Sequence, residues 1–148
     1  MTRPIRAQLS KSAIQHNYAL LKSHAPTAKA FAVVKANAYG HGVEFAARAL
    51  KDADGFATLE LESAIKLRNL GITQPILLLE GFFHPDELSV MDRYHFTTAV
   101  HSSHQVGEIM KAKLSSPLDV FIKINTGMNR LGFTDGGVRY ALGMAAGS

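Results

Sequence analysis

Short apolar runs recur along the chain at a nearly constant interval. Their first residues are separated by 25, 21, 20 and 22 positions. The runs are 30-AFAVV-34, 55-GFATL-59, 76-ILLLE-80, 96-FTTAV-100 and 118-LDVFIKI-124. Runs of this length that are apolar almost throughout are typical of parallel strands buried on both faces. We therefore predict a parallel sheet with one strand at each run.

The segments between the runs carry apolar residues at helical spacing. Before the first run the spacing is set by Ile14, Tyr18, Leu21 and Ala25. Further helices are predicted over 43–53, over 60–70 with Gly71 as C-terminal cap, from Pro85 with Asp86 and Glu87 in its first turn, and from Ser102 or Ser103 to Lys113. Strands that alternate with helices in this way indicate an α/β fold with helices covering a parallel sheet.

The interval between the apolar runs and the length of the chain are compatible with two α/β architectures. An open, doubly wound sheet of the flavodoxin type fits this many βα units. A (β/α)8 barrel typically needs about 250 residues, and this chain has 148, so length favours the open sheet. The last segment, 135-DGGVRYALGMAAGS-148, begins like another helix without a closing strand after it, which favours a piece of a longer protein.

Composition narrows the class of protein. The hydrophobic content of 47% and mean hydropathy of +0.03 indicate a globular chain, and the absence of cysteine removes disulfides and thiolate chemistry. The net charge is +4, but Lys and Arg are spread along the chain, so we expect no nucleic-acid partner. No run of 18 apolar residues predicts a membrane span, and 1-MTRPIRAQLSKS-12 lacks a signal-peptide core, so a cytoplasmic location is expected.

Lys35 stands at the carboxyl end of the first predicted strand. In parallel α/β folds, open or closed, ligands bind at this edge of the sheet. A lysine amine partly removed from water favours its neutral form, which can form a Schiff base with an aldehyde. Gly40 and Gly42 allow close approach of the backbone to a ligand, and Tyr39 offers a phenol for hydrogen bonding. A ligand with an aldehyde for the lysine and a phosphate for the glycine-containing loop is pyridoxal 5′-phosphate.

The stretch 32-AVVKANAYGHG-42 resembles the cofactor-lysine motif of the alanine racemases. The resemblance implies that Lys35 carries pyridoxal 5′-phosphate and that Tyr39 reaches the phosphate of this cofactor. Histidine at position 41 lies within the motif, and we expect it to orient the loop without a chemical role.

A second stretch, 123-KINTGMNRLGF-133, resembles the segment after the fifth barrel strand of the same family. The resemblance implies that Arg130 binds the substrate carboxylate and that Lys123, often carbamylated in the family, holds Arg130. Alternation along the strand places Lys123 on the face opposite Val120, Ile122 and Ile124. A carbamate on Lys123 would replace repulsion between two cations by a charge-assisted pair.

The resemblance extends over essentially all 148 residues, including 16-HNYALLKSHAP-26 and 78-LLEGFF-83. It implies that 1–148 is the N-terminal part of a barrel domain: about five strands of an incomplete (β/α)8 barrel, led in by a strand near 5–9, with the C-terminal β domain absent. This expectation replaces the open sheet.

The implied activity is interconversion of L-alanine and D-alanine, for peptidoglycan or for alanine catabolism. Lys35 is then one acid–base group, and the other is a tyrosine of the C-terminal domain, supplied by the partner subunit of a homodimer. We therefore expect little activity from this chain alone. The alternative is a non-enzymatic pyridoxal-phosphate-binding barrel of the homeostasis type, which would not need the Arg130 segment.

Other candidates are weaker. His101 and His104 are three residues apart, but no third ligand has supporting spacing, so we expect no metal site. Met128 lies in the Arg130 segment and is a candidate for lining the site.

Overall fold

The computed structural model describes residues 4–146, which form one parallel sheet and its covering helices. The strands are β1 (Phe31–Val33), β2 (Gly55–Thr58), β3 (Ile76–Leu78), β4 (Thr97–Val100) and β5 (Val120–Ile122). The helices are α1 (Lys11–His24), α2 (Lys35–Tyr39), α3 (Val43–Ala49), α4 (Leu61–Asn69), α5 (Glu87–Tyr94), α6 (Ser103–Lys111) and α7 (Asp135–Ala146). All five predicted strands are confirmed, each shorter than its apolar run. Within residues 4–146 no helix is both long and apolar enough to cross a membrane.

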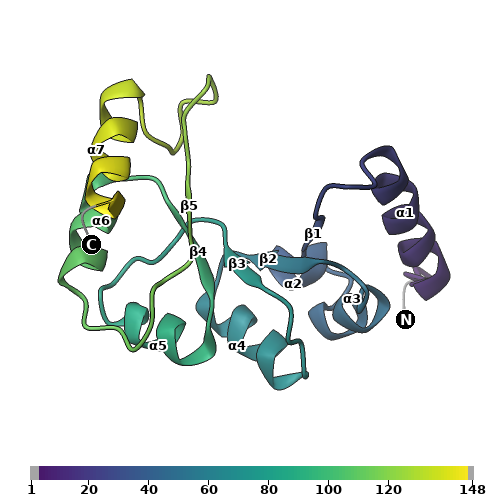
Figure 1. The fold of residues 1–148 in the computed structure, drawn as a ribbon. Helices are drawn as coiled ribbons and strands as arrows, with labels where there is room; N and C mark the ends of the chain where they lie inside the picture. The colour runs from purple at the N-terminus through teal and green to yellow at the C-terminus, as the bar shows by residue number, and fades with distance from the viewer. Residues whose placement is uncertain (1–3, 147–148) are drawn as a thin grey trace.

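The order of the strands separates the two architectures that the sequence left open. The sheet runs β1-β2-β3-β4-β5, and every neighbouring pair is parallel. A doubly wound sheet reverses its order at a switch point, whereas consecutive order is the arrangement of a (β/α)8 barrel. Figure 1 shows the strands as a curved ribbon with β1 near α1 at one end and β5 near α7 at the other. The prediction of barrel strands is confirmed, and the open doubly wound sheet is wrong.

The two faces of the sheet differ in what covers them. Ala32 of β1, Phe56 of β2 and Ile76 of β3 are paired in register and belong to the main core, which packs against the helices. We call this the outer face. The alternating positions, among them Val33 of β1 and Phe121 of β5, form the inner face, and both of these side chains are exposed. The inner face is the one that would line a barrel.

Several of the predicted helix ends can be compared with the structure. Gly71 follows α4 with φ +86, and its N–H donates to the carbonyl of Arg68, as expected of a C-terminal cap. Ser102 caps α6, since its hydroxyl accepts from the N–H of Gln105 at 3.3 Å. Helix α5 begins at Glu87, two residues later than predicted, because Pro85 and Asp86 form a turn before it.

The predicted lead-in strand near 5–9 is wrong. Residues 4–10 have no strand structure, and Ile5 is 77% exposed. A strand exists only when its backbone groups pair with a neighbour, and β1 pairs only with β2 in the part of the chain that the structure describes.

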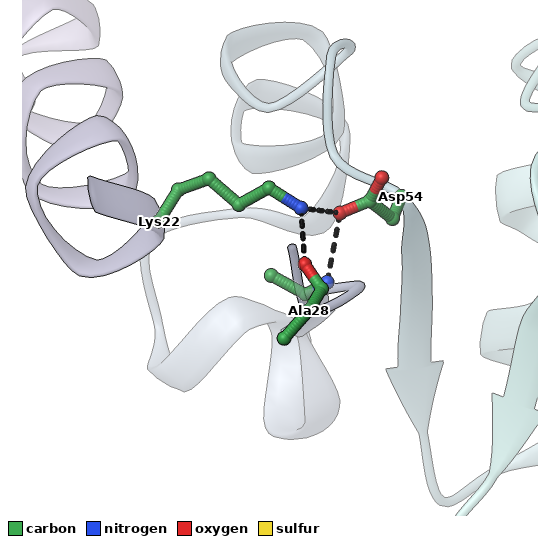
Figure 2. Close-up of polar contacts among 4 residues, drawn as sticks. Lys22, Ala28 and Asp54 are labelled. Atoms are coloured by element: carbon green, nitrogen blue, oxygen red, sulfur yellow. Dashed lines mark hydrogen bonds and ion pairs between the residues drawn. The ribbon is translucent and has the colours of Figure 1, made fainter. Parts of the chain in front are cut away.

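Helix α1 is fixed to the sheet by a polar contact (Figure 2). The Lys22 amine donates to Asp54 Oδ2 at 2.6 Å and to the carbonyl of Ala28, while the N–H of Ala30 donates to the same Asp54 oxygen at 2.8 Å. The hydrogen bonds from Lys22 and Ala30 lower the pKa of Asp54 below its ordinary value. This cluster joins the end of α1 to the chain entering β1 and to the chain entering β2.

Candidate functional site

Lys35 lies at the carboxyl edge of β1, where the sequence places it. The N–H of Val34 makes the last bond of the strand ladder, donating to the carbonyl of Ala57 at 2.8 Å, and the chain turns at Lys35. The Lys35 side chain is half-buried. Its amine makes no hydrogen bond or ion pair with any residue between 4 and 146, so a ligand can reach it without displacing a protein partner.

The chain after Lys35 has an unusual backbone. Residues Ala36, Asn37, Ala38 and Tyr39 all have φ between 50° and 54°, so α2 is a left-handed turn. Left-handed geometry costs about 1–2 kcal/mol for most residues other than glycine, asparagine and aspartate. Strain of this kind persists only where surrounding contacts enforce it, and it concentrates at functional sites. The turn leaves the Tyr39 side chain 61% exposed at the same edge of the sheet as Lys35.

Hydrogen bonds hold this left-handed turn. The N–H of Gly40 donates to the carbonyl of Ala36 at 3.1 Å, and the N–H of Gly42 donates to the carbonyl of Asn37 at 2.9 Å. His41 binds the carbonyl of Ala38 twice, through its own N–H at 3.1 Å and through ring Nδ1 at 2.9 Å. Because a carbonyl only accepts, Nδ1 carries the proton. The loop-orienting role predicted for His41 agrees with this contact.

Lys123 directly follows β5 on the inner face. Its N–H donates to the carbonyl of Val100 at 2.8 Å, which extends the pairing of β4 with β5. Since Val100 pairs with Ile122, the next register position sets Lys123 beside His101. The predicted alternation is therefore correct: Lys123 lies on the face opposite Ile122, and its side chain is half-buried.

Arg130 is presented by a loop with internal order. Asn125 Oδ1 accepts from the N–H of Gly127 at 3.1 Å and from the N–H of Asn129 at 3.0 Å. The ends of the loop are joined because the N–H of Phe133 donates to the carbonyl of Lys123 at 2.8 Å. The Phe133 ring is buried in a second core cluster between α6 and α7. Arg130 itself is exposed, and no bond joins it to Lys123 in the part that the structure describes.

Sequence reasoning missed the residues that hold these two loops. The Asn125 side chain accepts two backbone N–H groups from the turn that follows it, and the Asn37 side chain accepts the N–H of Val43 at the start of α3. The signal was available for Asn125, because Asn followed two residues later by Gly is a turn pattern. No local pattern pointed to Asn37, whose partner lies six residues ahead.

The two histidines considered for a metal are engaged differently. His101 Nε2 donates to the carbonyl of Glu80 at 3.0 Å, and buried Gln105 binds both the backbone N–H of His101 and that same carbonyl. His104 lies exposed on α6. Among residues 4–146 no three His, Cys, Asp or Glu side chains are grouped as a metal site would require. Met128 is 78% exposed in the Arg130 loop.

These residues fit the cofactor that the motif implies. Pyridoxal phosphate needs an amine for its aldehyde and hydrogen-bond donors for its phosphate. Lys35 offers an amine that is unpaired within residues 4–146, and Tyr39 offers an exposed phenol within one turn of it. The exposed Val33 side chain, two residues before Lys35 on the inner face, supplies an apolar surface beside them.

Comparison with known proteins identifies the family. The family model described as alanine racemase, N-terminal domain, matches residues 9–147. The chain belongs to the alanine racemase family. An alanine racemase of Erwinia tasmaniensis is 52% identical over 133 residues, which are 90% of this chain and 37% of that protein. A catabolic alanine racemase of Salmonella typhimurium is 51% identical over the same shares of both chains.

Solved structures agree with this assignment. The biosynthetic alanine racemase of Pseudomonas aeruginosa superimposes with a TM-score of 0.84 at 45% identity, over 87% of this chain and 36% of that one. An alanine racemase of Bartonella henselae with covalently bound pyridoxal phosphate gives a TM-score of 0.79 at 27% identity, over 91% and 39% of the two chains. A histidine racemase of Leuconostoc mesenteroides gives 0.85 at 29% identity, over 94% and 38%. The chain spans less than half the length of each of these relatives.

Proposed function

We propose that the protein is a pyridoxal-phosphate-dependent racemase of alanine and that this chain supplies the cofactor-bearing part of its barrel. The observation that carries the proposal is the Lys35 amine at the sheet edge, which has no partner among the described residues and is followed by a strained turn that presents Tyr39. Membership of the alanine racemase family supports the same activity.

Each site residue has one role in the proposal. Lys35 would hold the cofactor through its amine until the amine of the substrate takes that place. The freed Lys35 amine would then remove or return the α-proton on one face of the substrate, acting on the D-enantiomer. Tyr39 donates to the phosphate. When bound, pyridoxal phosphate withdraws electrons from the α-carbon and so makes its proton acidic.

Arg130 and Lys123 are proposed to act on the substrate's carboxylate. An arginine binds a carboxylate through two parallel hydrogen bonds. Arg130 is exposed on an ordered loop that begins directly after Lys123. A carbamate on Lys123 would turn a neighbouring cation into an anion and hold the guanidinium. Intact mass measured under native conditions tests the carbamate. If the parent chain shows no labile carbon-dioxide adduct, so that its profile of mass loss matches that of Lys123→Ala, the carbamate is contradicted.

Racemisation also needs an acid–base group on the opposite face of the substrate. We propose that a tyrosine of a C-terminal β domain supplies it from the partner subunit of a homodimer, as the family resemblance implies. The arginine that meets the pyridine nitrogen and most of the phosphate contacts are proposed to come from later barrel loops. The 148-residue chain alone is then expected to bind the cofactor weakly and to racemise alanine little or not at all.

The cellular role follows from the activity. D-alanine supply for peptidoglycan and alanine catabolism are both consistent with the relatives, which include proteins of either description. We place the protein in the cytoplasm, where alanine and pyridoxal phosphate are both present. Because a histidine racemase shares this fold, the substrate assay includes histidine beside alanine.

The test uses absorbance and isotope exchange on the purified chain. Addition of pyridoxal phosphate is expected to produce a visible imine band that is lost in Lys35→Ala. The matched control is Lys113→Ala, an exposed lysine on the connection after α6, which should keep the band. A band that survives in Lys35→Ala, or no band in the parent chain even with a large excess of cofactor, would overturn the cofactor site.

Enzyme and non-enzymatic binder are then separated by deuterium uptake. With the cofactor loaded, either alanine enantiomer in heavy water should exchange its α-proton at a rate that depends on Lys35, even if complete racemisation is very slow. Binding of the cofactor without any exchange for alanine or histidine would favour the homeostasis-type alternative.

A further inference from the structure

Asn37 lies at the centre of the left-handed turn, two residues after Lys35 and two before Tyr39. Its φ and ψ are 53° and 46°. Asn is one of the few residues other than glycine that visit this region readily, whereas its neighbours Ala36 and Ala38 have no such tendency. The turn therefore contains one residue suited to its backbone and needs contacts to fix the rest.

Both oxygen atoms of Asn37 bind consecutive amides at the start of α3. The carbonyl accepts from the N–H of Gly42 at 2.9 Å, and side-chain Oδ1 accepts from the N–H of Val43 at 2.9 Å. Gly42, the residue that precedes α3, has no side chain to cap the helix. Asn37 therefore satisfies a helix N–H that would otherwise lack a partner.

Helix α3 is a firm attachment point for the turn. Val43, Ala46 and Ala47 are buried in the main core. The hydrogen bond to Val43 thus connects the middle of the turn to a part of the chain held by packing. A turn fixed at its middle also fixes the separation of the residues on either side, which are Lys35 and Tyr39.

We propose that Asn37 is a positioning residue: its side chain, bonded to the N–H of Val43, holds the Lys35 amine and the Tyr39 phenol at the spacing that pyridoxal phosphate requires. This inference rests on the proposed cofactor site. It predicts that Asn37 matters for ligands that engage both groups at once, and matters little for a ligand that engages Lys35 alone.

Two aldehydes separate these cases. Pyridoxal phosphate can contact both Lys35 and Tyr39, whereas pyridoxal lacks the phosphate and can use only the lysine. The experiment measures the dissociation constants of both for the 148-residue chain by imine absorbance. Hydrogen exchange of the Val43 amide is followed in parallel by NMR, since this readout needs no cofactor.

Three variants divide the backbone effect from the side-chain effect. Asn37→Asp keeps an oxygen acceptor and the tolerance of left-handed geometry. Asn37→Gly keeps the tolerance but loses the acceptor, and Asn37→Ala loses both. We expect Asp to retain slow Val43 exchange and the preference for pyridoxal phosphate. We expect Gly and Ala to lose Val43 protection and to bind pyridoxal phosphate about tenfold more weakly, as for one lost hydrogen bond, with pyridoxal affinity unchanged.

The outcomes are distinct. If Asn37→Gly keeps the parent ratio of the two dissociation constants, or if Asn37→Asp behaves like Asn37→Ala, the positioning role is wrong. If the parent chain binds neither aldehyde, the proposed cofactor site fails first, and Val43 exchange still shows whether Asn37 holds the turn to α3. Should Asn37→Ala fail to fold, the comparison of the Gly and Asp variants decides.

Discussion

At the scale of single residues, the conformation of the loop that carries Arg130 requires glycine at position 132. Its φ is +117°, and a Cβ there would lie 2.7 Å from the backbone N of Asn125. Gly132→Ala therefore combines a disfavoured backbone with a backbone clash, and we expect it to lower the free energy of unfolding by more than about 1 kcal/mol. Urea denaturation monitored by circular dichroism measures this loss.

The matched control is Gly107 in the middle of α6, where an added Cβ would meet nothing within 4 Å. Gly107→Ala should raise the free energy of unfolding by about 0.5–1 kcal/mol, because alanine favours a helix over glycine. Equal effects of the two substitutions would mean that the Arg130 loop does not need the geometry described.

Lys35 and Asn37 mark how far single residues can be predicted. The position of Lys35 at the carboxyl end of a strand could be predicted because the apolar run and the point where it ends are local properties of the sequence. The left-handed turn could not be predicted, because Ala36 and Ala38 give no sign of positive φ. The turn is stabilised by hydrogen bonds to the start of α3. A contact between two separate segments cannot be predicted from the sequence of either segment alone.

At the scale of elements, α1 depends on the Lys22–Asp54 contact, which we expect to respond to pH. The pKa of Asp54 is lowered from its ordinary value of 3.8 by hydrogen bonds from Lys22 and Ala30. A lowered pKa in the folded state stabilises the fold above pH 3.8, and this contribution is lost as the pH falls below that value. Asp54→Asn should therefore be less stable than the parent chain near neutral pH, with the difference shrinking in acid.

Thermal unfolding of both chains from neutral to acidic pH checks this expectation. Asp52→Asn is the matched control, since Asp52 is exposed and meets Lys51 only at 4.0 Å. A difference between Asp54→Asn and the parent that stays constant across the range would assign the effect to packing and not to the carboxylate.

Elements were predicted well where their signals are local. The caps at Gly71 and Ser102 depend on neighbouring residues, and both were found. The lead-in strand near 5–9 failed because a strand needs a partner from elsewhere in the chain.

At the scale of the whole molecule, the period of the apolar runs could not decide between a barrel and an open sheet. Both architectures repeat strand and helix at similar intervals. Strand order decides, and order is a property of pairing between distant segments. The family motifs supplied that information indirectly, because each motif belongs to one architecture.

The curvature of the sheet brings its two edge strands into contact on the inner face. Phe31 of β1 and Phe121 of β5 are separated by three strands, yet their ring centroids are 6.3 Å apart in an edge-to-face arrangement. Since β1 and β5 each pair with a single strand in the described chain, this contact is a direct link between the ends of the arc. We expect the two rings to be energetically coupled.

A double-mutant cycle with Phe31→Leu and Phe121→Leu measures this coupling by urea denaturation. We expect an interaction energy of about 0.5 kcal/mol, at the low end for aromatic pairs because Phe121 is half exposed. The control cycle pairs Phe31→Leu with Phe83→Leu, an exposed ring on the connection after β3, and should be additive. If the first cycle is also additive, the rings do not interact in solution and the arc is more open than described. A coupled pair would show that the chain holds barrel-like curvature between β1 and β5, which is the geometry that the roles proposed for Lys35 and Arg130 require.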